Sequence, residues 1–339
     1  MATMLEHGHD ISTSRSFNDM LRRMGAAWNT LTTDVLTPDG HKIPNRRAIV
    51  RSDNRKPLGV VSDRYKVVHN SQLLRPVAAL VAETRESANP VRLVRGGVCD
   101  DGAKVWLRAT VGDPVPVGDA KLNDVVRCDV SVTATHDGSG ATRIRLVPLR
   151  LVCLNGMVAA GGGGSVSIVH RGDVDKQLEA YRDALRQLAK SWDQSMRAFN
   201  ALASARVQAM ATRATLTEIV REYVAAVFGR DEIRRQLEND GETPRVRAVR
   251  DAYYRGRGNS LATARSTGWG LYQALTDHLT HGRAVNDRRY LSLVDGGAAR
   301  HNERGLEVAY ARAVLGVRGE ALLDPDSSAM RDVRRALAA

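Results

Sequence analysis

Two neighbouring stretches of alternating apolar and polar residues constrain the fold of this chain more than any other feature. Within residues 125–150, Val130 and Val132 precede a glycine-containing turn, and Ile144 and Leu146 follow it. Successive side chains of a strand point to opposite faces, so a slip of one residue would exchange the two faces. The pattern therefore predicts an antiparallel hairpin in which Val132 lies opposite Ile144 and Val130 lies opposite Leu146.

The turn and the second face of this hairpin carry further information. The register leaves an odd number of residues in the turn at 136–140, which favours a bulged loop with a glycine in the left-handed region. The second face carries Arg127, Arg143 and Arg145 beside serine and threonine hydroxyls. We expect this polar face to be exposed to solvent.

The residues around this hairpin have the pattern of a mixed unit of strands and one helix. Two apolar runs at 58–61 and 65–68 are separated by three residues, which predicts a second hairpin. A helix with an apolar stripe follows from a cap at Asn70 or Ser71, and Pro76 lies inside it. Further strands are expected at residues 47–51, 91–95 and 103–110.

The second half of the chain has the 3.6-residue periodicity of helices. A long amphipathic helix is expected over residues 174–203, and a second helix ends before Gly229. Residues 230–245 have the composition of a charged linker. Shorter helices are expected at residues 244–255, 261–281 and 298–315.

The predicted fold class is α+β, a hairpin-rich antiparallel sheet with a packed helix, followed by a mainly helical C-terminal region. The first part of the chain is expected to be an arm that contains one short helix at residues 16–31. The expected division is an N-terminal arm at 1–44, an α+β domain at 45–172, a helical region at 173–318 and a loose tail at 319–339.

The charge of this 339-residue chain favours a polyanionic partner. The formal net charge is +12, and 43 of the 50 basic residues are arginine, whose planar fork binds phosphate well. A GC-rich genome is the alternative explanation for the arginine excess. No apolar stretch reaches the roughly 18 residues of a membrane helix, and the N-terminus has no apolar signal core. We expect a cytoplasmic protein without membrane association.

No spacing typical of an active site or a metal site is found in the sequence. The run at 161–164 is four glycines but lacks the lysine of a phosphate-binding loop, so a turn is expected. Cys153 lies in an apolar run, which favours a packed and unreactive thiol. The three cysteines are widely spaced, which is typical of neither a disulfide framework nor a zinc ribbon. We predict no catalytic residue, no metal site and no cofactor; a nuclease would need converging carboxylates.

Two clusters of basic residues and the polar face of the hairpin supply the candidate binding residues. Residues 46–75 contain eight basic residues against two aspartates, and residues 245–265 contain six arginines against one aspartate. Such side chains contact phosphates without reading bases, although an ordinary solvated charged face is the alternative interpretation. The predicted nucleic-acid-binding residues are Arg46, Arg47, Arg51, Arg64, Lys66, Arg127, Arg143, Arg145, Arg150, Arg255 and Arg257.

The aromatic content argues against a simple single-strand binder. Aromatic residues make up only 4% of the chain, and Trp106, Trp192 and Trp269 lie in patterns typical of buried residues. Platforms on which bases stack require exposed rings. Binding of a single strand would therefore depend on backbone charge and on the salt concentration.

Four separated segments resemble the motifs of a known family. They are residues 58–70 (LGVVSDRYKVVHN), 135–139 (THDGS), 148–155 (PLRLVCLN) and 267–278 (TGWGLYQALTDH). In this order they resemble the phage/plasmid-like proteins of domain-of-unknown-function family 932, with Leu154 where glutamine is usual. The resemblance covers about residues 45–310 and implies a mobile-element origin without supplying catalytic residues.

A weaker likeness connects the order of hairpins and helix to the Rad fifty-two-type single-strand annealing proteins. That likeness implies an arginine-rich groove for single strands and assembly into rings. Together these features predict a non-enzymatic nucleic-acid-binding protein of phage or plasmid type. It would bind or anneal single-stranded DNA in recombination or replication and form a homo-oligomer. The alternative is a protein-interaction or regulatory module, for host takeover or against host defence, that uses the helix at 174–203 and binds no DNA.

Overall fold

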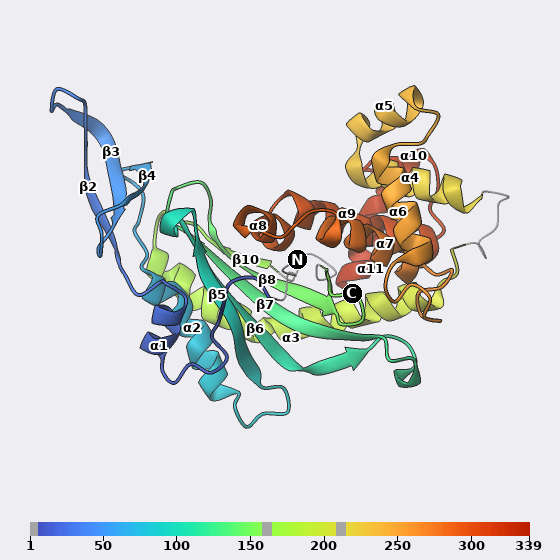
Figure 1. Ribbon diagram of the computed structural model, residues 1–339, viewed down its shortest axis with the longest axis horizontal. Coiled ribbons are helices and arrows are strands. Elements are labelled where there is room, and N and C mark those ends of the chain that lie inside the picture. The colour runs from blue at the N-terminus through green and yellow to red at the C-terminus, as the bar shows by residue number, and fades with distance from the viewer. Residues whose placement is uncertain (1–5, 158–164, 208–214) are drawn as a thin grey trace.

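The structure, a computed structural model, has an antiparallel sheet, a projecting three-stranded arm and a large helical region (Figure 1). The predicted α+β fold class, with its mainly helical C-terminal region, is confirmed. The residues described are 6–157, 165–207 and 215–339, with only the backbone described at 174–175, 181–182 and 184–190. The glycine run at 161–164 lies outside the described residues.

The main sheet is antiparallel throughout and has the strand order β1-β5-β6-β7-β8-β10, with β9 paired to β8. Its strands are β1 (His9–Asp10), β5 (Val91–Cys99), β6 (Lys104–Pro116), β7 (Val125–Thr135), β8 (Thr142–Arg150), β9 (Asn155–Gly156) and β10 (Ser165–Ile168). Val132 lies opposite Ile144 and Val130 lies opposite Leu146, as the alternation predicts. Gly138, in the turn, has a φ of 77° and so supplies the expected left-handed residue.

The apolar face of the sheet packs on three helices. These are α1 (Phe17–Arg23), α2 (Asn70–Glu83) and α3 (Val174–Ser204). Leu73 and Leu74 of α2 are fully buried in one cluster with Val132 and Ile144. The helix predicted at 174–203 is thus confirmed as α3. The N-cap of α2 is His69 rather than Asn70 or Ser71, and the helix continues through Pro76.

The polar face of the sheet is also covered, which corrects the expectation that it faces solvent. Helices α8 (Asp287–Asp295) and α9 (Gly297–Ala313) lie over it (Figure 1). The rings of Trp106 of β6 and Tyr290 of α8 are in contact, with centroids 4.1 Å apart, and His7 packs against both; Ser131 of β7 is only 2% exposed. Alternation distinguishes the two faces of a strand but does not reveal that a polar face is buried under another element.

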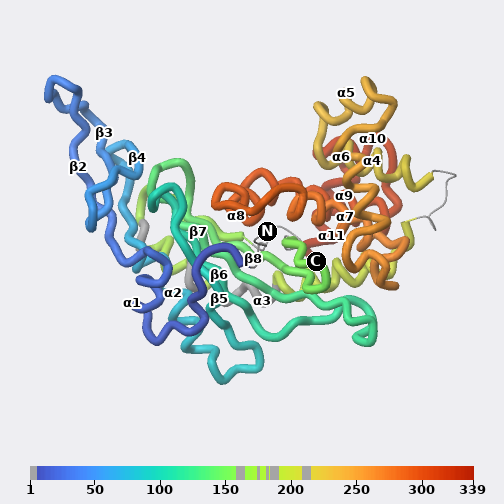
Figure 2. Tube along the Cα trace, in the orientation of Figure 1, coloured from blue at the N-terminus to red at the C-terminus, as the bar shows by residue number. Residues whose placement is uncertain are grey.

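The arm is a three-stranded antiparallel sheet that projects from the body, drawn in blue in Figure 2. Its strands are β2 (Thr30–Leu36), β3 (Lys42–Arg51) and β4 (Pro57–Ser62). Of the helix expected over residues 16–31, only the first part forms, as α1. It ends before Gly25, whose φ is 72°, and the chain then enters β2.

The hairpin predicted from 58–61 and 65–68 is wrong. Strand β4 pairs with β3, and residues 65–68 form no strand. The reason is a set of contacts to the body: the Tyr65 ring stacks on His170 with centroids 4.7 Å apart, and Tyr65 donates a hydrogen bond to the Thr135 carbonyl oxygen. These contacts draw the chain away from β4.

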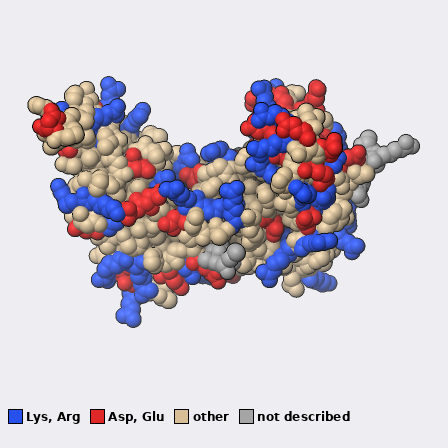
Figure 3. All heavy atoms as spheres, turned by 45° about the horizontal axis from the view of Figure 1, so that its top comes forward, with Lys and Arg blue, Asp and Glu red and all other residues tan. Residues whose placement is uncertain are grey.

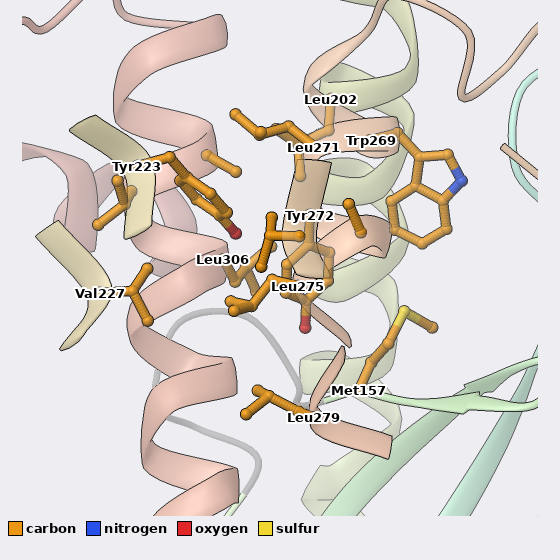
Figure 4. Packing of buried hydrophobic residues seen from close by; sticks show 14 of the residues in the cluster. Met157, Leu202, Tyr223, Val227, Trp269, Leu271, Tyr272, Leu275, Leu279 and Leu306 are labelled. Carbon is orange, nitrogen blue, oxygen red and sulfur yellow. The ribbon is translucent and has the colours of Figure 1, made fainter. Parts of the chain in front are cut away.

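The helical region packs around the core shown in Figure 4, where Trp269, Tyr272 and Leu275 of α7 meet Tyr223 of α4 and Leu306 of α9. Its other helices are α4 (Leu216–Phe228), α5 (Arg230–Glu238), α6 (Pro244–Arg255), α7 (Gly268–His281), α10 (Glu320–Leu323) and α11 (Ser328–Ala338), and two short 3₁₀ turns, η1 (Asp100–Gly102) and η2 (Ala120–Leu122), lie beside the main sheet. None of the helices in the described part of the chain is long and apolar enough to cross a membrane.

Three expectations for this region differ from the structure. The charged linker at 230–245 contains helix α5, and α8 was not expected. The last residues are not a loose tail, because Met330 and Val333 of α11 are fully buried. The amphipathic pattern of α11 covers few residues, and the helix is buried by contacts with α9 and with α3, which lies far away in the sequence.

The base of the arm fits tightly against the β7–β8 turn. A Cβ atom added at Gly59 of β4 would lie 2.5 Å from the carbonyl oxygen of Asp137. The contact is with backbone, so neither partner can move aside by rotating a side chain. Gly140, in the same turn, has open space at the corresponding position.

We predict that Gly59→Ala lowers the free energy of unfolding by about 1–3 kcal/mol, the usual cost of an overpacked position. Gly140→Ala is the matched control and should change it by less than about 0.5 kcal/mol. Urea unfolding of both variants measures the difference. Equal stability of the two variants would contradict the tight fit.

Candidate nucleic-acid interface

The three arginines of the β7–β8 hairpin are placed on one face, but each is paired with a carboxylate. Arg127 donates two hydrogen bonds of 2.7 Å to Asp129 on its own strand. Arg143 and Arg145 reach Asp295 of α8 at 3.1 and 3.6 Å. Arg143 remains 40% exposed, whereas the side chains of Arg127 and Arg145 are largely covered.

Arg150 lies at the centre of a buried network between the sheet and the helical region. Its guanidinium donates two hydrogen bonds to Asp124, at 2.6 and 2.7 Å, and both side chains have no exposed surface. Asp124 also accepts hydrogen bonds from Thr263 and from the indole of Trp269. Arg150 further donates to the Gly258 carbonyl oxygen at 2.9 Å, so it anchors a loop rather than facing solvent.

The basic residues of the arm and its base have different environments. Arg46 and Arg47 of β3 are exposed, as are Arg64 and Lys66 after β4. Arg51 instead binds Asp53, at 2.6 and 2.9 Å, and its guanidinium lies 4.5 Å from the Trp28 ring centroid. Arg51 therefore stabilises the start of the arm.

Three adjoining cavities bring part of the predicted set together. The first, of about 620 Å³, is lined by Arg46, Arg64 and Arg171 at the base of the arm. The second, of about 390 Å³, shares Arg171 with the first and runs along the β7–β8 turn. The third, of about 590 Å³, shares residues 139–141 with the second and lies between the sheet and α8. We call these three cavities the basic groove.

The basic groove has an excess of positive charge. Its lining contains seven cationic side chains and three carboxylates. The carboxylates are Asp63, Asp100 and Asp295. The cations are Arg46, Arg64, Lys104, Arg143, Arg171, Arg288 and Arg300. In Figure 3, blue side chains gather in the saddle between the arm and the helical region, with some red ones among them.

Five of the seven cations have no ion-pair partner among the residues that the structure describes. Arg143 is paired with Asp295, and Arg288 approaches Asp100 at 4.0 Å. Among the residues that the structure describes, no carboxylate forms an ion pair with the other five, Arg46, Arg64, Lys104, Arg171 and Arg300. A row of unpaired cations in a hollow is the arrangement that attracts an anionic chain.

Four lining cations of the groove were absent from the sequence prediction. Lys104 starts a strand and Arg171 follows one, while Arg288 and Arg300 belong to helices far along the chain. None lies within either basic cluster of the sequence. Only the folding of α8 and α9 over the polar face brings Arg288 and Arg300 to the sheet.

Arg255 and Arg257 lie apart from the residues that line the basic groove. Both are exposed and close the C-terminal end of α6. Their loop is held by Arg150, through the Gly258 carbonyl oxygen, and by Asn259, whose amide donates to the Ala252 carbonyl oxygen at 3.0 Å. The loop therefore presents its arginines from a fixed base.

The environment of Cys153 is that of a packed thiol. Cys153 is 2% exposed, and burial raises its pKa above the usual value. The ring of His281 contacts the carbonyl oxygen of Cys153 at 3.0 Å, not its sulfur. Burial thus disfavours the thiolate form of Cys153, and His281 is not placed to act as a base for its thiol.

Two buried histidines lie where the arm joins the sheet. His136 is 1% exposed, and its Nε2 lies 2.7 Å from Oδ1 of Asn70. Burial lowers the pKa of His136 to about 3, and burial likewise lowers the pKa of His170. Both rings are therefore neutral in the folded protein at neutral pH.

These features define an α+β protein with a basic groove between its sheet, its arm and helix α8. The chain belongs to the family described as "Domain of unknown function (DUF932)", whose family model matches residues 57–315. Comparison with curated proteins and with solved structures finds no match. The family resemblance of the sequence motifs is thereby confirmed.

We predict that Arg150→Ala destabilises the fold by about 3–5 kcal/mol, because Asp124 is left buried without its counter-ion. Arg143→Ala, which removes a partly exposed pair, should cost less than about 1 kcal/mol. Urea unfolding compares the two variants. A loss for Arg150→Ala no larger than that for Arg143→Ala would contradict the role of the buried pair.

We also predict that stability falls as the pH drops below about 6.5, where unfolded histidine becomes protonated. In this range the unfolded chain binds protons that folded His136 does not bind, so acid favours unfolding until about pH 3. His136→Gln should reduce the slope by up to about 1.4 kcal/mol per pH unit. The exposed His41→Gln is the control, and equal slopes for the two variants would disprove the assignment.

Proposed function

We propose that this protein binds nucleic acid along the basic groove and holds it by its phosphates, without a catalytic step. The observation that carries the proposal is the row of five unpaired cations in adjoining cavities. Four of them are arginines, whose forks suit phosphate oxygens. Contacts of this kind position a nucleic acid without reading its sequence.

The middle of the groove fits the same role. The middle cavity is lined on one side by the small residues 138–141 of the β7–β8 turn, and on the other by Tyr65, Val169, His170 and Arg171. The hydroxyl of Ser139 and the exposed backbone of the turn can contact phosphate and sugar. The groove therefore has cationic side chains at both ends, and between them a turn whose small residues allow a nucleic-acid backbone to approach closely.

The biological setting is part of the proposal. The sequence motifs resemble phage/plasmid-like proteins, and this supports a role on the DNA of a mobile element. We propose that the protein binds or anneals single-stranded DNA in recombination or replication, in the cytoplasm and as a homo-oligomer. The likeness to Rad fifty-two-type proteins supports this role only through the order of sequence elements.

A second candidate function is protein interaction through the arm. Leu31, Leu36 and Val60 of the arm are 37%, 57% and 57% exposed. Apolar side chains on a projecting sheet favour a protein partner or a second copy of the chain. Size-exclusion light scattering with and without DNA separates the candidates: a closed oligomer that ignores DNA would favour protein interaction.

The groove is tested by removing three of its charges at one end. In the variant Arg46→Gln, Arg64→Gln, Arg171→Gln, we expect weaker binding of a labelled oligonucleotide. The dependence of log Kd on log salt should become shallower by about two, since each phosphate contact on a single strand contributes about 0.7. Fluorescence anisotropy over a series of salt concentrations measures both quantities.

The matched control removes the same number of charges elsewhere. Arg22, Arg85 and Arg335 are exposed and do not line the basic groove. Replacing these three with glutamine should leave the salt dependence close to that of the unaltered protein. The proposal fails if the unaltered protein binds no oligonucleotide at low salt, or if both triple variants lose binding equally.

A further inference from the structure

Tyr254, at the end of helix α6, is unlike the other aromatic residues of the protein. Its side chain is 61% exposed, and it is the one exposed aromatic ring among the residues whose side chains are described. Trp106 and Trp269, in contrast, are buried as their sequence patterns predict, and are 1% and 0% exposed. The Tyr254 ring therefore presents a flat surface that is accessible to a partner.

The ring of Tyr254 is supported from beneath. It meets the ring of Tyr253 edge to face, with centroids 5.8 Å apart and planes 87° apart. Tyr253 itself is buried in the helical core. The contact with Tyr253 restricts the Tyr254 ring while its side chain stays exposed. This restriction reduces the conformational entropy lost when a flat partner stacks on the ring.

The surroundings of Tyr254 are cationic. Helix α6 carries four arginines and one carboxylate, Asp251. Arg247 lies seven residues before Tyr254 and Asp251 three residues before it, so both share its face of the helix. Within the described part of the chain, Arg247, Arg255 and Arg257 form no ion pair with a carboxylate, whereas Arg250 binds Glu242 at 2.7 Å.

The arginines next to the ring are held in place. The loop after α6 is anchored through Gly258 and Asn259 to the buried pair of Arg150 and Asp124. Arg255 and Arg257, one and three residues after Tyr254, thus extend from an anchored backbone. An exposed ring flanked by unpaired arginines is the arrangement that binds single strands, in which a base stacks and phosphates meet the cations.

We propose that Tyr254 is a stacking platform for an unpaired base of a single-stranded nucleic acid, with Arg255 and Arg257 on the flanking phosphates. The inference rests on the proposed function and sharpens it, because a base within a duplex is stacked on its neighbours and does not offer a free face to the ring. The basic groove holds phosphates of either kind of chain; the Tyr254 site selects the single strand.

The test compares a labelled oligothymidine with a labelled duplex, by fluorescence anisotropy. Tyr254→Ala should weaken oligothymidine binding about 5- to 150-fold, the usual effect of removing one stacking ring. Duplex binding should be unchanged. Tyr254→Phe and Tyr254→Trp keep a flat ring and should restore oligothymidine binding to nearly the original strength.

The salt dependence separates stacking from charge. Tyr254→Ala removes no charge, so the slope of log Kd against log salt should stay the same. Arg255→Gln with Arg257→Gln should make the slope shallower by about 1.4, since two phosphate contacts are lost. A change of slope in Tyr254→Ala would overturn the stacking role.

Failure of this inference is distinguishable from failure of the proposed function. If the unaltered protein binds neither probe, both the proposed function and the stacking role of Tyr254 are overturned. If it binds oligothymidine and Tyr254→Ala binds it equally well, or loses both probes equally, the basic groove stands and the stacking platform is overturned. If Tyr254→Ala alters self-association in light scattering and leaves oligothymidine binding intact, the ring belongs to a protein interface.

Discussion

The buried pair of Arg150 and Asp124 joins the two halves of this protein. Arg150 ends strand β8, and Asp124 precedes strand β7, so the pair closes one end of the central hairpin. The same two side chains bond to Thr263, Trp269 and the loop after α6. Two ions buried together are tolerated only when their remaining hydrogen-bonding groups are also satisfied. This requirement helps to fix where the helical region meets the sheet, and with it the placement of Arg288 of α8 and Arg300 of α9 in the groove.

The arginines of the protein divide into two populations with different roles. Arg51, Arg127, Arg145 and Arg150 each have an acidic partner and stabilise the fold. Arg46, Arg64 and Arg171 have none among the described residues and face a hollow. The net charge of the chain is thus not spread evenly. The cations in the interior are neutralised locally, and part of the uncompensated charge lines the basic groove.

The strand pairing could be predicted from sequence because it depends on a local rule. Val132 and Ile144 belong to stretches with a period of two residues, and only one register puts all apolar side chains on one face. The segment around Tyr65 does not follow this local rule, because Tyr65 stacks on His170, about a hundred positions away in the sequence. Local apolar pattern alone made residues 65–68 look like a strand.

The candidate site was harder to predict than the fold, for a related reason. The sequence shows that Arg143 is basic but not that Asp295, 152 residues later, lies beside it. Arg171 is an isolated arginine in the sequence and becomes part of a cluster only when β10 pairs with β8. Whether a cation is free or paired is a property of the tertiary structure, and so is the groove.

The close backbone contact between Gly59 and Asp137 holds the base of the arm in a fixed position against the body. Its far turn, residues 37–40, touches nothing that lines the groove, so changes of length there alter only how far the arm reaches. Extra bulk at the root would tilt the whole arm and move Arg46 relative to Arg171. Substitutions at the tip should therefore leave the groove unchanged, whereas substitutions at the root should alter its width.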